Sequence, residues 1–435
     1  MRIKQGLWKT YPVSMVMLLS TVGFLLCHVP FVGRPDGFYA WRHELTLFSG
    51  IQLIVLMSLG MLLGMRPLWL ERLLGGLDKM YRLHRRLGIA CAVMLSIHWS
   101  LHLLPGWLLG LGWISTVQHH APRQGFPWHA LAGQAGLWAA WAVLVLVTLS
   151  LLRRLPYRPW RKLHKLFPVV YLALVFHTLI LLPQALWLTP LGGVLALLML
   201  AACWSALVSL RRQVGSLQRY SGTITHLQPL PGAMLEVRCQ VPDWKGHVPG
   251  QFALVSFHAE EGAHPYTIAC AWQGKGVLRF VIKALGDYTT HLPQQLKIGD
   301  SLHLEGPYGG FTGALDGQPL AGPQVWVAAG VGVTPFLAWL QSMWQPLSVP
   351  VDLFYCVRQT GEAAGLAEMQ GYCQSLGIRL HVLESSQGQR LEAAALPQAS
   401  DVWFCGPQGL GVKLQQQLAA RSNPPRFHHE AFSLR

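Results

Sequence analysis

The stretch KMYRLHRRLGIACAVMLSIHWSLHLL, residues 79–104, decides the fold of this chain. It begins in a basic cluster and continues as an apolar run long enough to cross a bilayer, which requires about 20 residues. His84 and His98 lie fourteen residues apart within it. On an α-helix this spacing places both imidazoles near one face, about 21 Å apart along the axis. The stretch therefore predicts a membrane helix that carries two histidines at different depths.

A second apolar stretch, LHKLFPVVYLALVFHTLILL at residues 163–182, carries a matching pair. His164 and His177 lie thirteen residues apart, or about 20 Å along a helix. A polar side chain inside a bilayer is costly unless it has a partner, and neutral imidazole is a common axial ligand of heme iron. Pairing by depth predicts two b-type hemes, an inner one between His84 and His164 and an outer one between His98 and His177.

Two points leave the ligand assignment open. His102 is a rival to His98 because it lies on the same face, five full turns after the inner histidine, although its height of about 27 Å matches the second helix less well. On an ideal helix His177 would also point about 140° away from His164. The prediction therefore requires an irregular helix near Pro168, since proline kinks or breaks helices.

Hydropathy and charge predict the topology. Hydrophobic residues are 52% and charged residues 12% of the chain, a composition typical of a membrane protein. Of the 20 Lys and Arg residues before residue 215, 17 lie on one side of the apolar stretches, so that side and both termini are expected in the cytoplasm. We expect an integral protein of a bacterial inner membrane, surrounded by lipid and without a nucleic-acid partner. Six spans are predicted, near residues 12–32, 44–65, 84–104, 129–152, 163–183 and 189–210.

The composition changes after about residue 215. Short alternating stretches separated by glycine and proline turns predict a small antiparallel barrel. Three segments of this region combine aromatic, hydroxyl and glycine residues: HPYT at residues 264–267, GDYTT at residues 286–290 and GPYG at residues 306–309. Aromatic rings can stack on a planar cofactor, and glycine turns allow the backbone to approach phosphate groups.

From Pro323 onward, buried strands alternate with helices, which predicts a parallel sheet covered by helices. The motif GVGVTP at residues 330–335 forms the turn between the first strand and its helix, with Pro335 at the first helical position. A later strand ends in CGP at residues 405–407, and the chain ends in FHHEAFSLR.

Taken in this order, the histidine spacings and the motifs resemble the NADPH oxidase and ferric reductase family over residues 44–435. The resemblance implies a multidomain membrane protein: a six-helix transmembrane heme bundle at residues 1–212, an antiparallel FAD-binding β-barrel at residues 213–322 and an α/β NAD(P)H-binding domain at residues 323–435. It implies that Cys405, Glu430 and Phe432 act where hydride is transferred, with Phe432 covering the flavin. The residues implied in binding FAD and the nucleotide are His264, Pro265, Tyr266, Thr267, Gly286, Thr289, Thr290, Gly306, Tyr308, Gly330, Gly332, Thr334, Pro335, Gly406 and Pro407.

The implied activity is that of an NAD(P)H oxidase or ferric reductase. Electrons would pass from cytosolic NADPH or NADH through FAD and two hemes to an acceptor across the membrane, either dioxygen, which becomes superoxide, or a ferric or cupric ion. A quinone or a periplasmic redox protein is an alternative acceptor, and Arg358 is a candidate contact for the 2′-phosphate of NADPH. A hypothesis of another class is a heme-binding membrane subunit or sensor without turnover. The intact flavin and nucleotide motifs favour the enzyme.

Overall fold

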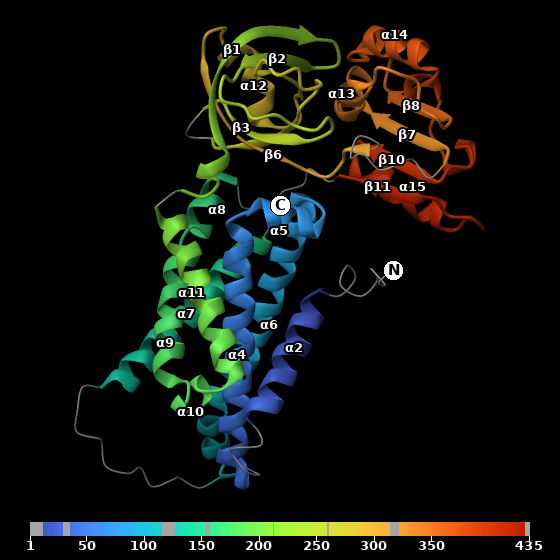
Figure 1. Cartoon of the computed structure of the whole chain (residues 1–435). Coiled ribbons are helices and arrows are strands. Elements are labelled where there is room, and N and C mark those ends of the chain that lie inside the picture. The colour runs from blue at the N-terminus through green and yellow to red at the C-terminus, as the bar shows by residue number, and fades with distance from the viewer. Residues whose placement is uncertain are drawn as a thin grey trace. The chain divides into compact units, whose positions relative to one another are not determined.

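The structure is a computed structural model, which describes residues 12–28, 35–114, 127–152, 157–211, 213–258, 261–313 and 322–430. The chain divides into two compact units (Figure 1). The first comprises Met1–Leu70 and Lys79–Val214, and the second comprises Glu71–Asp78 and Gly215–Leu434. The short segment Glu71–Asp78, which contains the end of α5 (Leu68–Leu74) and the start of α6 (Leu77–Gly110), thus belongs with the C-terminal half.

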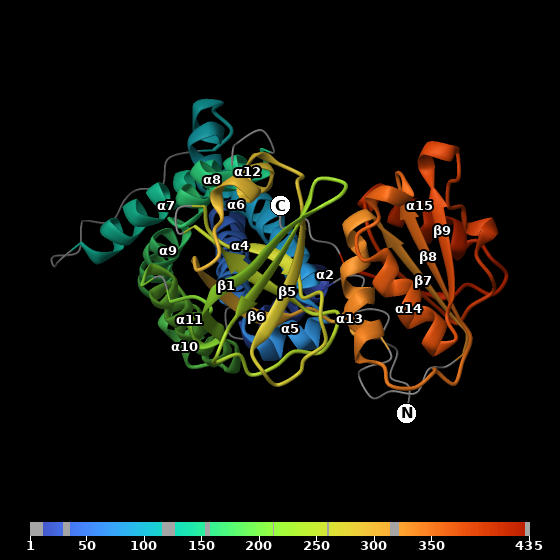
Figure 2. The same ribbon diagram turned by 90° about the horizontal axis from the view of Figure 1, so that it is seen from above.

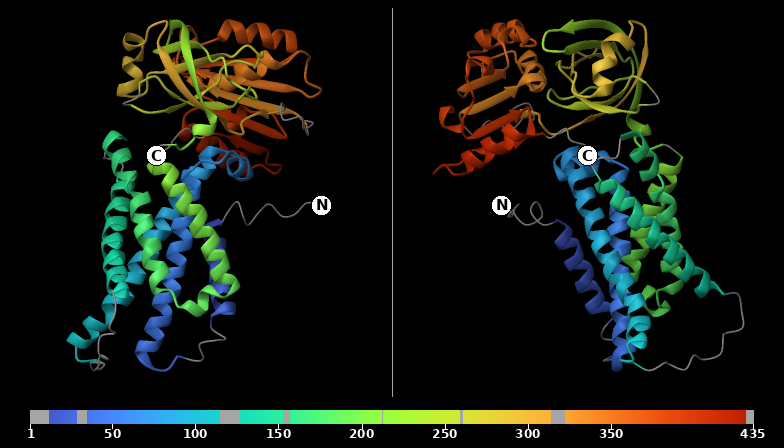
Figure 3. Two further views of the ribbon diagram at one scale, coloured as in Figure 1. Left: turned by 60° about the vertical axis from the view of Figure 1, so that its left-hand side comes forward. Right: turned by 180° about the vertical axis from the view of Figure 1, so that it is seen from behind.

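Long apolar helices form the first unit, and they run side by side in Figure 3. These stretches are helical because a helix satisfies its own backbone hydrogen bonds where no water is present. The longest is α6, whose 34 residues contain the stretch 79–104. The helices are α2 (Pro12–Cys27), α4 (Gly37–Gly64), α5 (Leu68–Leu74), α6 (Leu77–Gly110), α7 (Trp128–Leu151), α8 (Tyr157–His164), α9 (Phe167–Leu181), α10 (Gln184–Trp187) and α11 (Pro190–Leu210).

The prediction of six spans is wrong for the described part of the chain, where five spans are long and apolar enough to cross a membrane. One of the five, Pro159–Leu181, includes α9 and most of α8. The first predicted span is observed as α2, which has 16 residues. A helix of that length extends for about 24 Å, whereas a hydrocarbon core is about 30 Å thick. Hydropathy identified the apolar residues of this segment correctly but not the extent of its helix.

The core of the first unit lies among α2, α4, α9 and α11. The Tyr171 ring is fully buried there, and its hydroxyl lies 2.8 Å from Ser58 Oγ. On the outside, the Trp138 and Leu197 side chains are each 71% exposed. Large apolar side chains on an outer surface indicate contact with lipid, as expected for an integral membrane protein.

The second unit begins with a six-stranded antiparallel sheet in the order β4-β3-β6-β1-β2-β5. A closed barrel was predicted, and this prediction is not confirmed: between the edge strands the described residues form a single bridge, from Ile268 to Phe280. Alternating apolar residues specify the strands but not whether their edges pair. The elements are β1 (Arg219–Leu230), β2 (Met234–Gln240), β3 (Phe252–Ser256), β4 (His264–Thr267), β5 (Val277–Lys283), α12 (Asp287–Gln295) and β6 (Ser301–Tyr308).

The second unit continues as a five-stranded parallel sheet in the order β11-β10-β7-β8-β9. Helices cover both of its faces (Figure 2): α13 and α14 pack on one face, and α15 packs on the other. The chain passes from β7 to β8 on one side of β7 and later adds β10 on the other side of β7. The strand order therefore reverses between β7 and β10. The elements are β7 (Gln324–Ala329), α13 (Thr334–Ser342), β8 (Val351–Val357), α14 (Leu366–Leu376), β9 (Arg379–Glu384), β10 (Asp401–Cys405), α15 (Gln408–Ala419) and β11 (Arg426–His429).

Candidate functional site

The predicted inner histidines face one another. His84 on α6 and His164 at the end of α8 have ring centroids 5.9 Å apart, with the ring planes inclined at 64°. His84 Nδ1 lies 3.0 Å from the carbonyl oxygen of Gly60. Because a carbonyl oxygen only accepts hydrogen bonds, this nitrogen carries the proton and donates it, which leaves Nε2 with a free lone pair.

His164 has the same tautomer for a less direct reason. Its Nδ1 lies 3.3 Å from Ser150 Oγ. The Ser150 hydroxyl donates its own hydrogen to the carbonyl oxygen of Leu146, at 2.7 Å. Since a hydroxyl has one hydrogen to donate, it accepts from His164, and Nε2 again has a free lone pair.

The predicted outer histidines repeat this arrangement. His177 Nδ1 donates to the carbonyl oxygen of Ala132 at 2.8 Å. His98 Nδ1 lies 2.9 Å from Ser49 Oγ, whose hydroxyl donates to the carbonyl oxygen of Thr46 at 3.0 Å. Both rings therefore present an unprotonated Nε2, and no group among the described residues bonds either of these atoms.

Two glycines provide space for the outer rings. A Cβ on Gly136 would overlap the His177 imidazole, and a Cβ on Gly50 would lie 3.3 Å from Cε1 of His98. His102, the rival of His98, is exposed on the surface of the first unit. Four imidazoles with the same tautomer, each fixed through Nδ1, form a donor set that can hold heme iron in the two pairs predicted.

The helix that carries the second pair is interrupted, as the prediction required. Helix α8 ends at His164 and α9 begins at Phe167, and Pro168 occupies the first turn of α9. Because proline lacks a backbone N–H and disfavours a helical conformation in the residue before it, the break precedes it. An interrupted helix does not impose the angle of about 140° that an ideal helix would set between His164 and His177.

The HPYT motif forms β4 at the edge of the antiparallel sheet, where Pro265 pairs with Leu254 of the neighbouring strand β3. The His264 ring stacks on Tyr288, with centroids 4.9 Å apart and planes inclined at 19°. Thr267 is 8% exposed. The buried hydroxyl of Tyr266 has no hydrogen-bond partner among the described residues, and burial raises its pKa. A buried phenol without a partner is an atom that a bound group would satisfy, so the motif fits a flavin.

The GDYTT segment forms the N-terminus of α12, with Gly286 as its N-cap residue. Thr289 Oγ1 accepts from the backbone N–H of Leu285 at 2.9 Å, and Thr290 Oγ1 donates to the carbonyl oxygen of Gly286 at 2.9 Å. The first amides of such a helix favour an anion. The segment, which the family resemblance implies in cofactor binding, therefore offers backbone amides suited to a phosphate group.

The GPYG segment differs in part from its predicted role. The Tyr308 side chain is fully buried, and its hydroxyl donates to Glu305 Oε1 at 2.6 Å. It is the last residue of β6, a strand that also contains Gly306, and Gly309 follows directly. The backbone N–H of Gly309 donates to Glu71 Oε1 at 3.0 Å, and burial raises the pKa of the Glu71 carboxyl group.

The two nucleotide motifs meet where the order of the parallel strands reverses. GVGVTP follows β7, and CGP ends β10. A Cβ on Gly332 would overlap the carbonyl oxygen of Cys405 and would lie 2.9 Å from the nitrogen of Gly406, so the two turns are in direct contact. Ligands of such sheets bind in the crevice at this reversal point. Thr334 and Pro335 begin α13 there, and Pro407 is the N-cap residue of α15.

Sequence reasoning missed Lys283, whose Nζ would lie 3.7 Å from a Cβ on Gly330. It is the last residue of β5 in the antiparallel sheet, so only the folded structure brings an ammonium group to the glycine turn. Tyr288, which stacks on His264, was also missed as a contact. A search for aromatic residues within the GDYTT segment could have found it.

Cys405 and Glu430 lie together at the end of the parallel sheet. The register of β10 and β11 pairs Phe404 with His429, which brings the next residues of both strands side by side. Burial, with a smaller effect from Glu430, raises the pKa of the Cys405 thiol, so the sulfur is protonated and not a thiolate nucleophile. Phe432, the predicted flavin cover, lies outside the described residues.

Comparison with known proteins matches both halves of the chain. Residues 49–175 match the family described as ferric reductase like transmembrane component, a range that contains His84, His98 and His164. Residues 234–312 match the family described as oxidoreductase FAD-binding domain. The resemblance to the NADPH oxidase and ferric reductase family is thereby confirmed.

Three relatives are similar to parts of the chain. The heme-dependent oxidative N-demethylase beta subunit of Ectopseudomonas mendocina (strain ymp) is 39% identical over 148 residues, which cover 33% of this chain and 45% of that protein. The carnitine monooxygenase reductase subunit of Escherichia coli (strain K12) is 28% identical over 50% of this chain and 64% of that protein. NADPH oxidase 3 of Rattus norvegicus is 31% identical over 28% of this chain and 22% of that protein. The chain thus spans less than two thirds of each of these relatives.

The fold and these matches describe a membrane oxidoreductase. Residues 49–175 are similar to a ferric-reductase-like transmembrane domain, and residues 234–312 are similar to an oxidoreductase FAD-binding domain.

Proposed function

We infer that this protein is a transmembrane electron relay, because it joins a ferric-reductase-like transmembrane domain to an FAD-binding oxidoreductase domain. NAD(P)H in the cytoplasm is the donor, FAD and two b-type hemes are the carriers, and the acceptor lies across the membrane. The proposed domains are residues 1–212 for the hemes, 213–322 for FAD and 323–435 for the nucleotide.

The observation that carries the proposal is the common state of four histidines. His84, His98, His164 and His177 all donate a hydrogen bond from Nδ1 to the protein. A histidine with a purely structural role has no reason to adopt the same tautomer as three other histidines, or to face a second imidazole. Unprotonated Nε2 atoms are suited to hold heme iron. We assign one heme to the facing rings of His84 and His164. We assign the other to His98 and His177, with His98 favoured over the exposed His102.

When bound, FAD accepts a hydride and the hemes transfer single electrons, so the role of the protein is to bind and orient them. We assign the flavin to Tyr266, Thr267 and the N-terminus of α12. His264 and Pro265 shape the same edge of the sheet. The phosphates of the nucleotide are assigned to the glycine turn, with Lys283 as a cationic contact.

Hydride transfer is assigned to the end of the parallel sheet, where Cys405 and Glu430 lie together. Gly406 and Pro407 hold the backbone of this turn against the glycine turn, and Phe432 covers the flavin until the nicotinamide enters. Arg358 directly follows β8 and is exposed, so its guanidinium is available for a 2′-phosphate, which favours NADPH over NADH.

If each heme were held by two histidines, its iron would have no open position. The acceptor would then be reduced without binding to the iron. A small acceptor, either dioxygen or a ferric or cupric ion, meets this requirement. We assign both termini to the cytoplasm and the protein to a bacterial inner membrane, and the excess of Lys and Arg on one side of the apolar stretches supports this orientation.

The proposal is tested by anaerobic reduction of the purified full-length protein, followed by rapid mixing with acceptors. NADPH should reduce the hemes faster than NADH does, and dioxygen or a ferric chelate should reoxidise them. Reoxidation by a quinone alone would identify a different acceptor. If NADPH and NADH both leave the flavin and the hemes oxidised while dithionite reduces them, the chain is a heme-binding subunit or sensor without turnover.

A further inference from the structure

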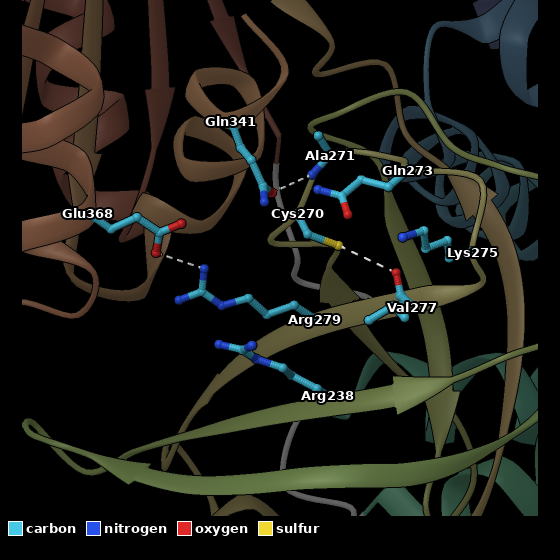
Figure 4. A pocket seen from close by; sticks show the side chains of 9 residues that line it. All are labelled: Arg238, Cys270, Ala271, Gln273, Lys275, Val277, Arg279, Gln341 and Glu368. Carbon is cyan, nitrogen blue, oxygen red and sulfur yellow. Dashed lines mark hydrogen bonds and ion pairs between the residues drawn. The ribbon is translucent and has the colours of Figure 1, made fainter. Parts of the chain in front are cut away.

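A cavity of about 340 Å³ lies within the second unit, between the antiparallel sheet and the helices α13 and α14 of the parallel sheet. Its walls include Arg238 on β2, Arg279 on β5 and Lys275 on the loop before β5. Figure 4 shows the Arg238 and Arg279 side chains running parallel, with Lys275 on the far side of the cavity. Gln341 of α13 and Glu368 of α14 close it.

The positive charge of this cavity exceeds the negative charge near it. Its lining contains three cationic side chains and one carboxylate, Glu368. A second carboxylate, Glu236, has 3% of its side chain exposed and binds Arg238 at 2.7 Å and Arg279 at 2.8 Å. With both carboxylates counted, one positive charge remains uncompensated.

The buried Glu236 carboxylate bridges the two arginines and offsets the repulsion between them. Arg238 and Arg279 lie directly opposite one another on neighbouring strands, where like charges destabilise a sheet. Glu236 binds Arg238 through Nε, and no described residue pairs with the terminal nitrogens of that guanidinium or with the Lys275 ammonium. These groups remain as donors that point toward an empty volume.

The cavity is separate from the proposed nucleotide site. Gln341 lies seven residues after Thr334 on α13, or about 10 Å along the helix from the end that carries the glycine turn. A buried apolar cluster that includes Ala269, Val281 and Val331 lies between the two sheets as well. None of the steps assigned to electron transfer uses the cavity.

We propose that this cavity is a binding site for a small phosphate-bearing anion, with Arg238, Lys275 and Arg279 as its cationic contacts. Guanidinium groups offer paired donors that match phosphate oxygens, and an ammonium adds a mobile point charge. The volume accommodates a phosphate group with a small substituent. The ligand is either free phosphate or the phosphate of a small metabolite.

Occupancy of this site would act on the contact between the two sheets. Arg279 NH1 donates to Glu368 Oε2 at 2.8 Å, and this ion pair joins β5 to α14. An anion bound to Arg279 competes with Glu368 for the same guanidinium. Because this ion pair joins the two sheets, phosphate bound at the site should weaken the contact between the flavin half and the nucleotide half of the unit.

The test measures binding to the full-length protein in detergent. Inorganic phosphate and adenosine 5′-monophosphate are titrated separately by calorimetry at an ionic strength held constant with sodium chloride. Phosphate should bind saturably in the wild type. Lys275→Gln removes an exposed side chain that has no partner, so it should keep the fold and the flavin and weaken phosphate binding about tenfold, the effect of losing one charged hydrogen bond.

The matched control is Lys297→Gln, which removes the same charge from an exposed residue outside the cavity and should leave phosphate affinity unchanged. Tighter binding of adenosine 5′-monophosphate than of phosphate, lost in Lys275→Gln, would identify a phosphorylated metabolite as the ligand class. Three results would overturn the proposal: no saturable phosphate binding above the chloride background, equal losses in Lys275→Gln and Lys297→Gln, or unchanged affinity in both Lys275→Gln and Arg238→Gln.

Discussion

The two units position their candidate cofactor contacts by different means. In the membrane unit each contact is a histidine side chain on a helix, and a group on another helix fixes its Nδ1, as Gly60 does for His84. In the soluble unit the contacts lie mainly in turns at the ends of strands, such as Gly332 after β7 and Gly406 after β10. Cofactor binding in the membrane unit therefore depends on particular side chains. In the turns of the soluble unit it depends on glycines, which have no side chain.

This difference has a consequence for substitution. Removing one side chain in the membrane unit should abolish a whole binding site, since a metal ligand has no substitute nearby. In the soluble unit a backbone turn should be most sensitive to added atoms, because Gly332 already contacts Cys405. The following predictions test the comparison, from the largest expected effect to the smallest.

The substitution His98→Leu should remove the outer heme completely and halve the heme content, because leucine offers no lone pair to the iron. The measurement is heme per polypeptide in the purified protein, together with the absorbance of the reduced protein. The matched control is His102→Leu, which should keep both hemes because His102 is exposed. If His98→Leu keeps both hemes while His102→Leu loses one, the ligand assignment passes to His102.

The substitution Gly136→Ala should also reduce outer heme content, since the new methyl group would overlap the His177 ring and displace the Nε2 atom. The loss should be partial, because side chains shift to relieve overpacking at a cost of about 1–3 kcal/mol. Gly133→Ala lies on the same helix with open space around it, and it should have no effect. Equal heme content in the two variants would contradict the proposed place of His177.

In the soluble unit, Gly332→Ala should slow reduction of the flavin by NAD(P)H by about tenfold, because the added methyl group forces the two nucleotide turns apart at a cost of about 1–3 kcal/mol. Heme content should not change, which separates the two units. Gly361→Ala, at a glycine with nothing within 4 Å of a new Cβ, is the control. A similar rate in both variants would mean that contact between the turns is unimportant.

The smallest effect concerns pH and the far edge of the parallel sheet. Asp352 accepts from Arg379 Nε at 2.8 Å and lies 2.9 Å from His381 Nε2. The Arg379 hydrogen bond, more than any other contact, holds the pKa of Asp352 below its ordinary value. A carboxyl group with a depressed pKa stabilises the fold fully above its unfolded pKa of about 3.9, and the contribution is lost as the pH falls through the folded pKa.

Asp352→Asn should therefore lower the apparent Tm of the soluble unit by a few degrees at pH 7, the equivalent of about 1–2 kcal/mol. The estimate is kept low because the Arg379 side chain is 63% exposed and solvent screens the pair. Thermal unfolding measured from pH 7 to pH 3 should show the difference from the wild type shrinking below about pH 4. Asp243→Asn, at an exposed carboxyl group, should follow the wild type at every pH.

The sequence allowed accurate prediction where function depends on spacing along one element. The heights of His84 and His98 follow from helix geometry, and the break before Pro168 follows from proline chemistry. Contacts made across elements could not be predicted in this way. The carbonyl oxygen of Gly60 becomes the partner of His84 only when α4 and α6 pack together, and no local pattern identifies a backbone atom as a hydrogen-bond partner.

The same reason explains the remaining differences. Lys283 reaches the glycine turn from another sheet, and Tyr308 points into the core because its hydroxyl bonds Glu305. The antiparallel sheet closes only if its two edge strands pair with one another. The alternation of apolar residues along each strand does not predict that pairing. The length of α2 depends on where its helix ends, which hydropathy does not report.

The central claim is that the membrane unit holds two hemes that receive electrons from the soluble unit. It is tested most directly by measuring heme per polypeptide in the full-length protein and the fraction of that heme reduced anaerobically by NADPH. The account predicts two hemes per chain, both reduced by NADPH, and the second lost in His98→Leu. A single heme in the wild type, or two hemes that dithionite reduces and NADPH does not, would contradict it.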